Sequence, residues 1–296
     1  MSMYELQNEK ILIRVDSHGA ELKSLKRLTS GVLPKGTEYM WKADPAFWGR
    51  TSPVLFPFVG GVNHKEYRTK GKTYAMSQHG FARDMEFELL SQTEEEIWMI
   101  LHSGEETLEK YPYKFTLKLG YRLLADGVLV CWQVENPGEE ELPFSIGGHP
   151  AFNCPIQEGK KQTDYRLRLD AQGEIISTRL SGSGLATQQK DIYSLKEGYL
   201  AVTEDLFDQD ALVIERDQAK KVSLCLEDGT PYLTVEMEAP LFGIWSPPHK
   251  NAPFICIEPW YGRCDREDFS GELKDREWGN CIAPGQVWKA AYQIRV

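Results

Sequence analysis

The sequence predicts an all-β fold: a single large antiparallel β-sandwich over residues 1–296, with a few short helices. Apolar and polar residues alternate with a period of two in several segments, which is typical of half-buried strands. Turn residues separate these segments at close spacing, and helical patterns are few and short. No Gly/Ser/Pro-rich linker or break in composition divides the chain, so we expect one domain.

The expected strands lie mainly in the second half of the chain. In residues 288–296 every second residue is apolar, from Trp288 to Val296. Residues 128–132 are apolar throughout, which predicts a strand with both faces buried. The other segments with a strand pattern are 117–123, 165–169, 221–226 and 232–237.

Two Asp-Gly pairs are expected to join strands into hairpins. Asp126-Gly127 and Asp228-Gly229 would supply the positive φ angles that tight hairpins require. Helices are expected only in short pieces. Residues 104–110 could make two turns, and residues 45–48 and 203–207 could make one turn each.

Charge and composition exclude several classes of partner. The 296 residues carry a formal net charge of -10, and an acidic surface repels the phosphates of nucleic acids and anionic membranes. The N-terminal residues lack a signal-peptide pattern, and no run approaches the ~20 apolar residues of a membrane helix. We therefore expect a cytoplasmic protein, a monomer or homodimer, with reduced cysteines in its core.

Glu258 is the first candidate for chemistry. It follows the apolar run 254–257, and Pro259 is expected to end the strand directly after it. Burial disfavours the charged form of an acid, so this carboxylate could titrate closer to neutrality and move protons. Trp260, beside it, is a side chain that sugar pockets commonly offer. The alternative is a strand-end glutamate held in a salt bridge.

Other polar residues interrupt apolar or glycine-rich segments. Arg50 precedes a proline-rich aromatic loop and offers a planar fork of donors for sugar oxygens. His79 and His149 both adjoin glycines, and a histidine can donate a proton near pH 7. Asp208 and Asp210 open an apolar strand. Each of these residues, taken alone, could equally be an ordinary turn residue.

The motifs of several other chemistries are missing. The sequence has no H-x-H, H-E-x-x-H or paired-cysteine spacing, so no metal site is expected. It has no G-x-S-x-G nucleophile elbow and no phosphate-binding or dinucleotide-binding loop. We therefore expect no cofactor.

Five segments, taken in order, resemble the aldose 1-epimerase (galactose mutarotase) family, most closely its LacX-like branch. The resemblance extends from about Tyr4 to Val296, and its motifs are the segments 49–50, 78–83, 147–152, 210–212 and 243–262. It implies a galactose-mutarotase-type β-supersandwich, with a site in a cleft across one large sheet. It also implies interconversion of the α and β anomers of an aldose.

The resemblance further implies roles for individual residues. Glu258 would be the general base and His149 the general acid, while His79 and Arg50 would assist and bind the sugar. An aspartate would hold sugar hydroxyls. The sequence departs from galactose mutarotases proper here, and Asp210 is preferred to Asp208 because the LacX-like pattern keeps Asp-Ala-Leu at this point.

The expected mechanism uses an ionised Glu258 and a protonated His149, one for each of two proton transfers. Either Trp245 or Trp260 could stack on the apolar face of the sugar, or both could belong to the sandwich core. Two other functions stay open. A hexose-6-phosphate 1-epimerase would need a basic cluster, to which Arg83 with Lys65 or Arg68 could contribute. A non-catalytic carbohydrate-binding module is the other alternative.

Overall fold

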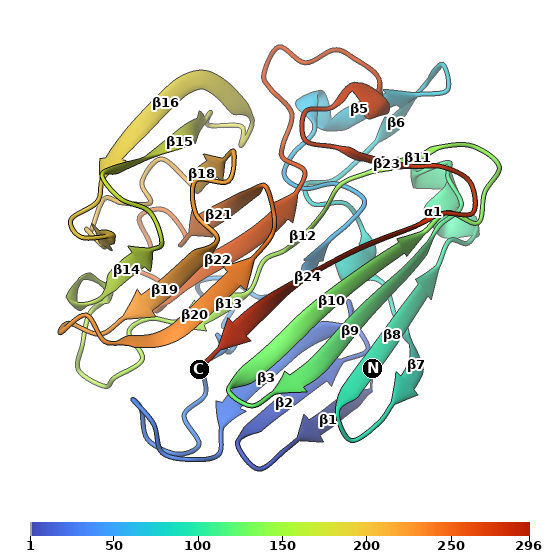
Figure 1. Ribbon diagram of the computed structural model, residues 1–296. Coiled ribbons are helices and arrows are strands. Elements are labelled where there is room, and N and C mark those ends of the chain that lie inside the picture. The colour runs from blue at the N-terminus through green and yellow to red at the C-terminus, as the bar shows by residue number, and fades with distance from the viewer. Residues whose placement is uncertain (1) are drawn as a thin grey trace.

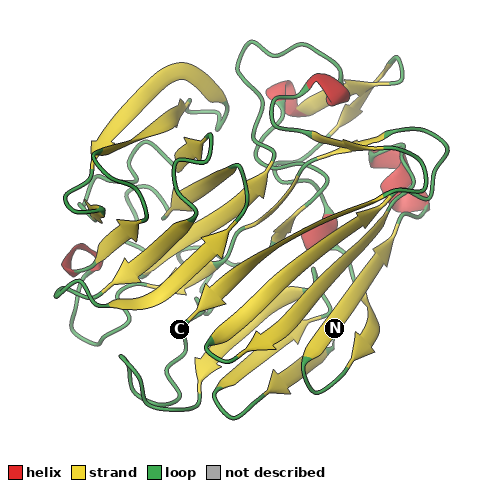
Figure 2. Cartoon of the chain, in the orientation of Figure 1, coloured by secondary structure: helices red, strands yellow, loops and turns green. Residues whose placement is uncertain are grey.

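The computed structural model describes residues 2–296 and confirms the all-β prediction. Strands make up nearly all of the regular structure, and the few helices are short (Figures 1 and 2). Every strand pair within the sheets is antiparallel, as the close spacing of turns predicts.

Two large sheets form the body of the protein. The nine-stranded sheet has the order β17 (Tyr199–Ala201), β14 (Arg166–Leu169), β19 (Lys221–Cys225), β20 (Pro231–Met237), β24 (Val287–Arg295), β10 (Gly127–Glu135), β9 (Thr116–Leu124), β8 (Glu96–His102), β7 (Glu88–Gln92). The eight-stranded sheet has the order β16 (Ala186–Ser194), β15 (Glu174–Leu180), β18 (Leu212–Glu215), β21 (Leu241–Trp245), β22 (Phe254–Tyr261), β12 (Ile146–Gly148), β4 (Val54–Leu55), with β13 (Ala151–Asn153) also paired to β22.

Smaller elements complete the chain. They are the sheet β1 (Met3–Gln7), β2 (Ile11–Asp16) and β3 (Glu21–Arg27), the pair β5 (Glu66–Thr69) and β6 (Lys72–Ala75), and the pair β11 (Leu142–Phe144) and β23 (Asn280–Ile282). The helix α1 spans Glu105–Lys110, and 3₁₀ turns span Asn63–Lys65, Ala82–Asp84, Gln162–Asp164 and Leu273–Asp275.

One hydrophobic core joins the two large sheets. Ile255 and Ile257 of β22 are fully buried in the same cluster as Trp132 of β10 and Tyr292 of β24. The ring of Trp132 packs at 5.2 Å from that of Tyr292. Burying a large apolar side chain contributes about 1.5–3 kcal/mol, so this core supplies most of the stabilisation.

The predicted strands and one of the predicted helices are present. The hairpins β9–β10 and β19–β20 include four of the expected segments, and α1 lies within the expected residues 104–110. At 45–48 and 203–207, where one helical turn each was expected, the chain forms isolated hydrogen-bonded turns that do not extend into a helix.

The two Asp-Gly pairs behave differently. Gly229 has φ +87°, as the hairpin prediction requires. Gly127 instead begins β10, and the two-residue turn before it is Ala125-Asp126. A Cβ at position 127 would collide with the carbonyl oxygen of Ile294 on β24, so close strand packing explains this glycine.

The prediction that Pro259 ends its strand was also wrong, since β22 continues to Tyr261. The N–H of Ile257 donates to the carbonyl of Pro150, so the nitrogen of Pro259, two residues on, faces the same side. On that side the partner of β22 changes from β13 to β12. The missing N–H of proline therefore falls at a break in the ladder, where a strand tolerates it.

All six cysteines are free thiols, and Cys225 and Cys256 are buried, as expected for reduced core residues. Cys131 is half-buried. Within residues 2–296 the structure contains no helix that is both long enough and apolar enough to cross a membrane.

Candidate functional site

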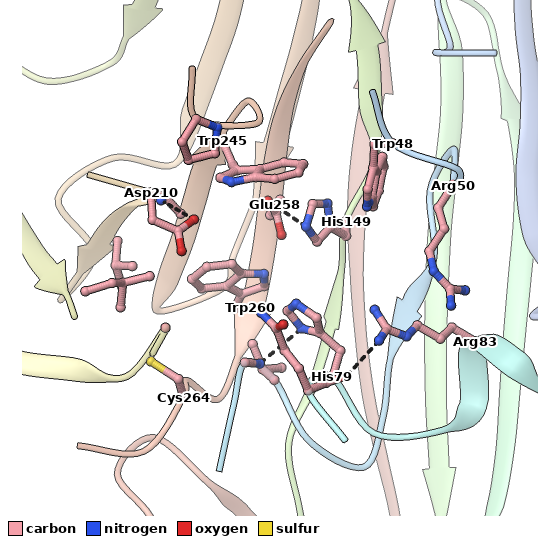
Figure 3. Close-up of a pocket in the computed structure, with 18 residues that line it drawn as sticks. Trp48, Arg50, His79, Arg83, His149, Asp210, Trp245, Glu258, Trp260 and Cys264 are labelled. Atoms are coloured by element: carbon pink, nitrogen blue, oxygen red, sulfur yellow. Dashed lines mark hydrogen bonds and ion pairs between the residues drawn. The ribbon is translucent and has the colours of Figure 1, made fainter. Parts of the chain in front are cut away.

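A cavity of about 450 Å³ lies against the eight-stranded sheet and collects every residue that the sequence predicted for the site. Those residues come from segments far apart in the chain, and Figure 3 shows them around one space. They are Arg50, His79, His149, Asp210, Trp245, Glu258 and Trp260.

The period of β22 places Glu258 in this cavity. Ile255 and Ile257 point into the core between the sheets, so Glu258 and Trp260 share the opposite face of the strand. That face is covered too, and Glu258 is only 1% exposed. The run 254–257 is apolar because both faces of this strand are buried.

Two glycines make room for the indole of Trp260. A Cβ at Gly243 on β21 would lie 2.5 Å from the Trp260 ring, and a Cβ at Gly147 on β12 would lie 2.7 Å from it. The indole therefore passes between two strands that flank β22, and it lines the cavity beside Glu258.

His149 follows the end of β12 and contacts Glu258. Its backbone N–H donates to the carbonyl of Pro53, which holds the chain in place after the two glycines. Its Nε2 lies 3.3 Å from Oε1 of Glu258. Within residues 2–296, Nδ1 of His149 and Oε2 of Glu258 are buried without a hydrogen-bond partner.

Aromatic rings enclose the imidazole of His149. Trp48 stacks on it at 4.7 Å between ring centroids, and Trp245 meets it edge-on at 5.3 Å. Both tryptophans line the cavity, as does Trp260. The sequence analysis did not select Trp48, although its place two residues before Arg50 in a proline-punctuated aromatic loop could have indicated it.

The environment of the pair favours neutral forms of both side chains. Burial raises the pKa of Glu258 well above its ordinary value. The indole of Trp260 lowers this pKa and Asp210 raises it, but burial is the largest effect. Burial, with the guanidiniums of Arg83 and Arg50 nearby, lowers the pKa of His149 to about 3. This differs from the expected ionised Glu258 and protonated His149, because desolvation outweighs their mutual attraction.

The backbone fixes the tautomer of His79. The N–H of Gly60 donates to Nδ1 of His79 at 3.1 Å, and the N–H of His79 donates back to the carbonyl of Gly60 at 2.9 Å. Burial, followed by nearby His149, lowers the pKa of His79 well below its ordinary value, so the ring is neutral. Its proton must then be on Nε2, which makes His79 a hydrogen-bond donor.

Two arginines line one side of the cavity, and Asp210 lies on the other side in the view of Figure 3. Arg50 pairs with Asp84 at 2.7 Å, and Arg83 donates to the carbonyl of Gln78 at 2.7 Å. Burial and the neighbouring Arg50 lower the pKa of Arg83 to about 10. The half-exposed carboxylate of Asp84 is thus shared by two guanidiniums, which leaves this side of the cavity with a net positive charge.

Glu21 holds the segment that carries Arg50. Its Oε1 accepts hydrogen bonds from the N–H groups of Thr51 at 2.6 Å and Ser52 at 2.7 Å. Bonds to a charged acceptor are stronger than neutral ones, so this carboxylate restrains the backbone directly after Arg50. The sequence analysis had no signal for Glu21, which lies on β3, in the small N-terminal sheet.

The two candidate aspartates occupy different places. Asp210 lines the cavity, with φ +71° and its Oδ1 accepting from the N–H of Ala211. Asp208 pairs with His249 at 3.0 Å. Lys65 and Arg68, named for a possible phosphate cluster, line two other hollows, while Arg83 lines the main cavity.

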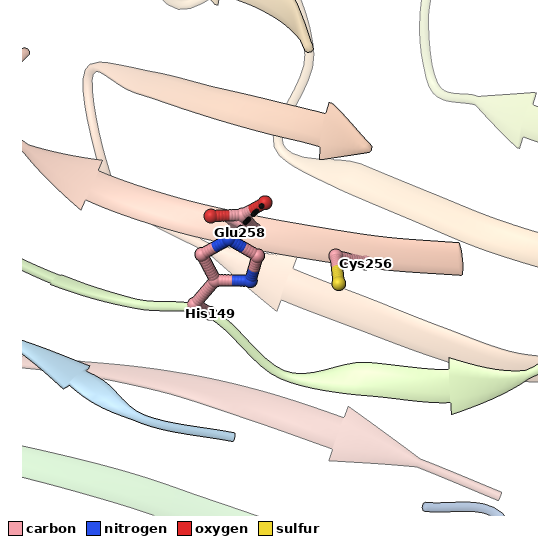
Figure 4. Close-up of side chains that lie close together, drawn as sticks. All are labelled: His149, Cys256 and Glu258. Carbon is pink, nitrogen blue, oxygen red and sulfur yellow. Dashed lines mark ion pairs between the residues drawn. The ribbon is translucent and has the colours of Figure 1, made fainter. Parts of the chain in front are cut away.

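Cys256 lies beside the pair on the same face of β22 (Figure 4). One ligand atom each from His149, Cys256 and Glu258 lie within 4.8 Å of one another. Burial, followed by nearby Glu258, raises the pKa of this thiol well above its ordinary value. The sequence analysis took Cys256 for a core residue only, although a spacing of two before Glu258 places both on one face.

Comparisons with known proteins agree with this architecture. Residues 2–295 match the family model for aldose 1-epimerase. The chromosomal protein LacX of Lactococcus lactis subsp. lactis is 30% identical over 301 residues, covering 99% of this chain and 98% of that protein. A galactose mutarotase related enzyme from Lactobacillus acidophilus superposes with a TM-score of 0.92 at 34% identity, covering 99% of this chain and 97% of that one. A galactose mutarotase-like protein from Lactobacillus casei ATCC 334 gives a TM-score of 0.88 at 30% identity, over 99% of both chains.

Proposed function

The chain belongs to the aldose 1-epimerase family, and on this premise we propose that it is an isomerase that interconverts the α and β anomers of a free aldose. The contact of His149 with Glu258 carries the proposal, since Nε2 and Oε1 lie 3.3 Å apart beside the cavity. Mutarotation needs one acid and one base at two oxygens of the same carbon. Two adjoining side chains suit that requirement.

The proposed reaction begins with ring opening. Glu258 takes the proton from the hydroxyl at C1 while His149 gives a proton to the ring oxygen, and the C1–ring oxygen bond breaks to leave an aldehyde. Rotation about the C1–C2 bond presents the other carbonyl face. Reclosure returns the proton from the ring-oxygen hydroxyl to His149 and the proton on Glu258 to the new C1 oxygen. Positioned acid and base groups typically contribute about 10²–10⁴-fold each.

A single proton shared by the pair reconciles this scheme with the pKa directions. A protonated Glu258 with neutral His149 and an ionised Glu258 with protonated His149 differ only by one proton moved across the contact. Burial favours the first form. A bound sugar would favour the second, because its C1 hydroxyl donates to the carboxylate and its ring oxygen accepts from the imidazolium.

The other predicted residues would bind the sugar. Asp210 would accept from hydroxyls, while Arg50 and the Nε2–H of His79 would donate to sugar oxygens. Trp245 and Trp260 line the cavity and could cover the apolar face of the ring. These roles match the residue types and their placement around one space.

The proposal is tested with freshly dissolved α-D-glucose and α-D-galactose. Proton NMR of the anomeric signals should show a faster approach to equilibrium, in proportion to protein concentration, with an unchanged final ratio of anomers. If calorimetry shows that the sugars bind while the anomers exchange at the uncatalysed rate, the protein is a carbohydrate-binding module instead.

A second candidate is a hexose-6-phosphate 1-epimerase. The observation that favours it is the pair Arg50 and Arg83 on one side of the cavity, with Asp84 as the partner of both. Guanidinium groups bind phosphate well. Comparing anomerisation rates on glucose and glucose 6-phosphate distinguishes the candidates, since only a phosphate-selective enzyme would favour the second sugar strongly.

A further inference from the structure

We propose that His149, Cys256 and Glu258 form a binding site for a thiophilic divalent cation such as Zn²⁺. The bound ion would prevent His149 and Glu258 from acting as the acid–base pair. The inference concerns an ion and not the sugar, and it stands on the arrangement of the three side chains. Figure 4 shows them converging from β22 and from the segment that follows β12.

The ligand set is one that zinc uses. Imidazole nitrogen, thiolate sulfur and carboxylate oxygen are its usual protein ligands, and three protein ligands with one open position are typical of accessible zinc sites. His149 and Glu258 line the cavity, so an ion could enter from it and keep its fourth position toward it. Hard cations such as Mg²⁺ prefer oxygen ligands, so a site that includes a thiol would bind them poorly.

The distances are close to those of a tetrahedral ion. Two ligand atoms about 2.1 Å from a tetrahedral centre lie about 3.4 Å apart. Nε2 of His149 and Oε1 of Glu258 already lie 3.3 Å apart. The ligand atoms of all three residues lie within 4.8 Å of one another, so Sγ of Cys256 would have to close in by no more than about 1 Å.

Charge and unfilled hydrogen-bond capacity also favour an ion here. A dication with one thiolate, one carboxylate and one neutral imidazole has no net charge, which is the form that a buried site tolerates. Glu258 is 1% exposed, and its Oε2 has no hydrogen-bond partner anywhere in residues 2–296. Buried oxygens of this kind are normally paired, and an ion held by both carboxylate oxygens would satisfy Oε2 as well as Oε1.

The geometry makes ion binding and catalysis mutually exclusive. An ion held by Nε2 of His149 and the carboxylate of Glu258 would displace the proton that the pair exchanges with the sugar. Chelators should therefore never lower the rate of anomerisation, and Zn²⁺ should inhibit it.

Direct binding to metal-free protein gives the first test. One equivalent of Co²⁺, used as a spectroscopic stand-in for Zn²⁺, should produce a thiolate-to-cobalt charge-transfer absorption. The band should disappear in Cys256→Ser and persist in Cys264→Ser, whose thiol also lines the cavity. If the band is absent at one equivalent, persists in Cys256→Ser, or disappears in Cys264→Ser, the proposed site is wrong.

Inhibition and a second variant complete the design. The rate of each variant is expressed relative to its own rate without the ion. The Zn²⁺ concentration that halves this rate should be at least about tenfold higher in Cys256→Ser than in the wild type, because losing even a residue that only supports a metal ligand weakens metal binding by that much. Should Cys256→Ser fail to fold, His149→Asn keeps the thiol and must still weaken Co²⁺ binding by calorimetry. Unchanged binding in His149→Asn contradicts the site whether or not the protein anomerises sugars.

Discussion

Nε2 of His149 lies 3.3 Å from Oε1 of Glu258, so side chains from distant parts of the chain form one unit beside the cavity. The strand β22 supplies the glutamate, and the short segment after β12 supplies the histidine. β12 is hydrogen-bonded to β22, and this sheet pairing is what brings the two together.

Replacing His149 with glutamine should slow anomerisation by about 10²–10⁴-fold, because the amide cannot give up a proton to the ring oxygen. The anomeric NMR signals measure the rate. His102→Gln, on β8 of the other sheet, is the matched control and should leave the rate unchanged. A His149→Gln protein that keeps the wild-type rate would remove the histidine from the mechanism.

Asparagine at position 210 should raise KM more than it lowers kcat, since Asp210 lines the cavity and is proposed to accept from sugar hydroxyls. Hydrogen bonds to charged groups contribute about 1.5–3 kcal/mol, which corresponds to roughly 10–100-fold in KM. Asp208→Asn is the control, because Asp208 pairs with His249. A larger KM effect from Asp208→Asn would mean that the wrong aspartate was assigned.

Alanine at Gly243 should destabilise the protein and displace Trp260, because its Cβ would lie 2.5 Å from the indole. Overpacking of this kind costs about 1–3 kcal/mol. Urea unfolding measures the loss, and tryptophan fluorescence reports the altered environment. Gly104→Ala, where a Cβ would meet nothing within 4 Å, serves as control. Equal stability of the two variants would refute the proposed tight fit.

Stability should fall in acid partly through Glu215, a buried carboxylate next to Arg263. Although burial alone would raise its pKa, Thr178, Arg263 and Lys190 together lower it below the ordinary 4.5. Because the pKa of Glu215 is lower in the folded protein than in the unfolded chain, its ionised form stabilises the fold at pH values above the unfolded pKa of 4.5. This stability is lost as the pH falls through the folded-state pKa.

The Glu215→Gln variant should therefore show a flatter dependence of unfolding free energy on pH below about 4.5 than the wild type. At neutral pH it should be less stable by on the order of 1–3 kcal/mol, because Arg263 loses a charged partner. Glu238→Gln, at an exposed position, is the control. Parallel pH curves for the wild type and Glu215→Gln would contradict this role.

Patterns within short segments of the sequence were sufficient to predict many of the strands and the individual residues of the candidate site. The period of two in 288–296 corresponds to a strand because strand faces alternate, and the apolar run 254–257 corresponds to a strand that is buried on both faces. The five ordered motifs were sufficient to select all seven predicted residues that line the cavity. Asp210 could be preferred to Asp208 only through the resemblance.

The remainder depends on contacts between distant segments. The pairing of β12 with β22 determines that His149 meets Glu258, and nothing in either segment specifies that partner. Pro259 was misread because its tolerance inside β22 depends on a break in the neighbouring strands. The raised pKa of Glu258 agrees with the burial expected from its apolar run. The lowered pKa of His149 could not be predicted, since it follows from complete burial and from the nearby Arg83 and Arg50.

The most direct test of the account is the rate of anomerisation by Glu258→Gln, measured with the free aldose that the wild-type protein turns over. Glutamine has nearly the same shape as glutamate but cannot take a proton, so the rate should fall by at least about 10²-fold. Circular dichroism and the unfolding midpoint should show that the fold is intact. A Glu258→Gln protein that is folded and keeps the full wild-type rate would contradict the central claim that Glu258 is the base.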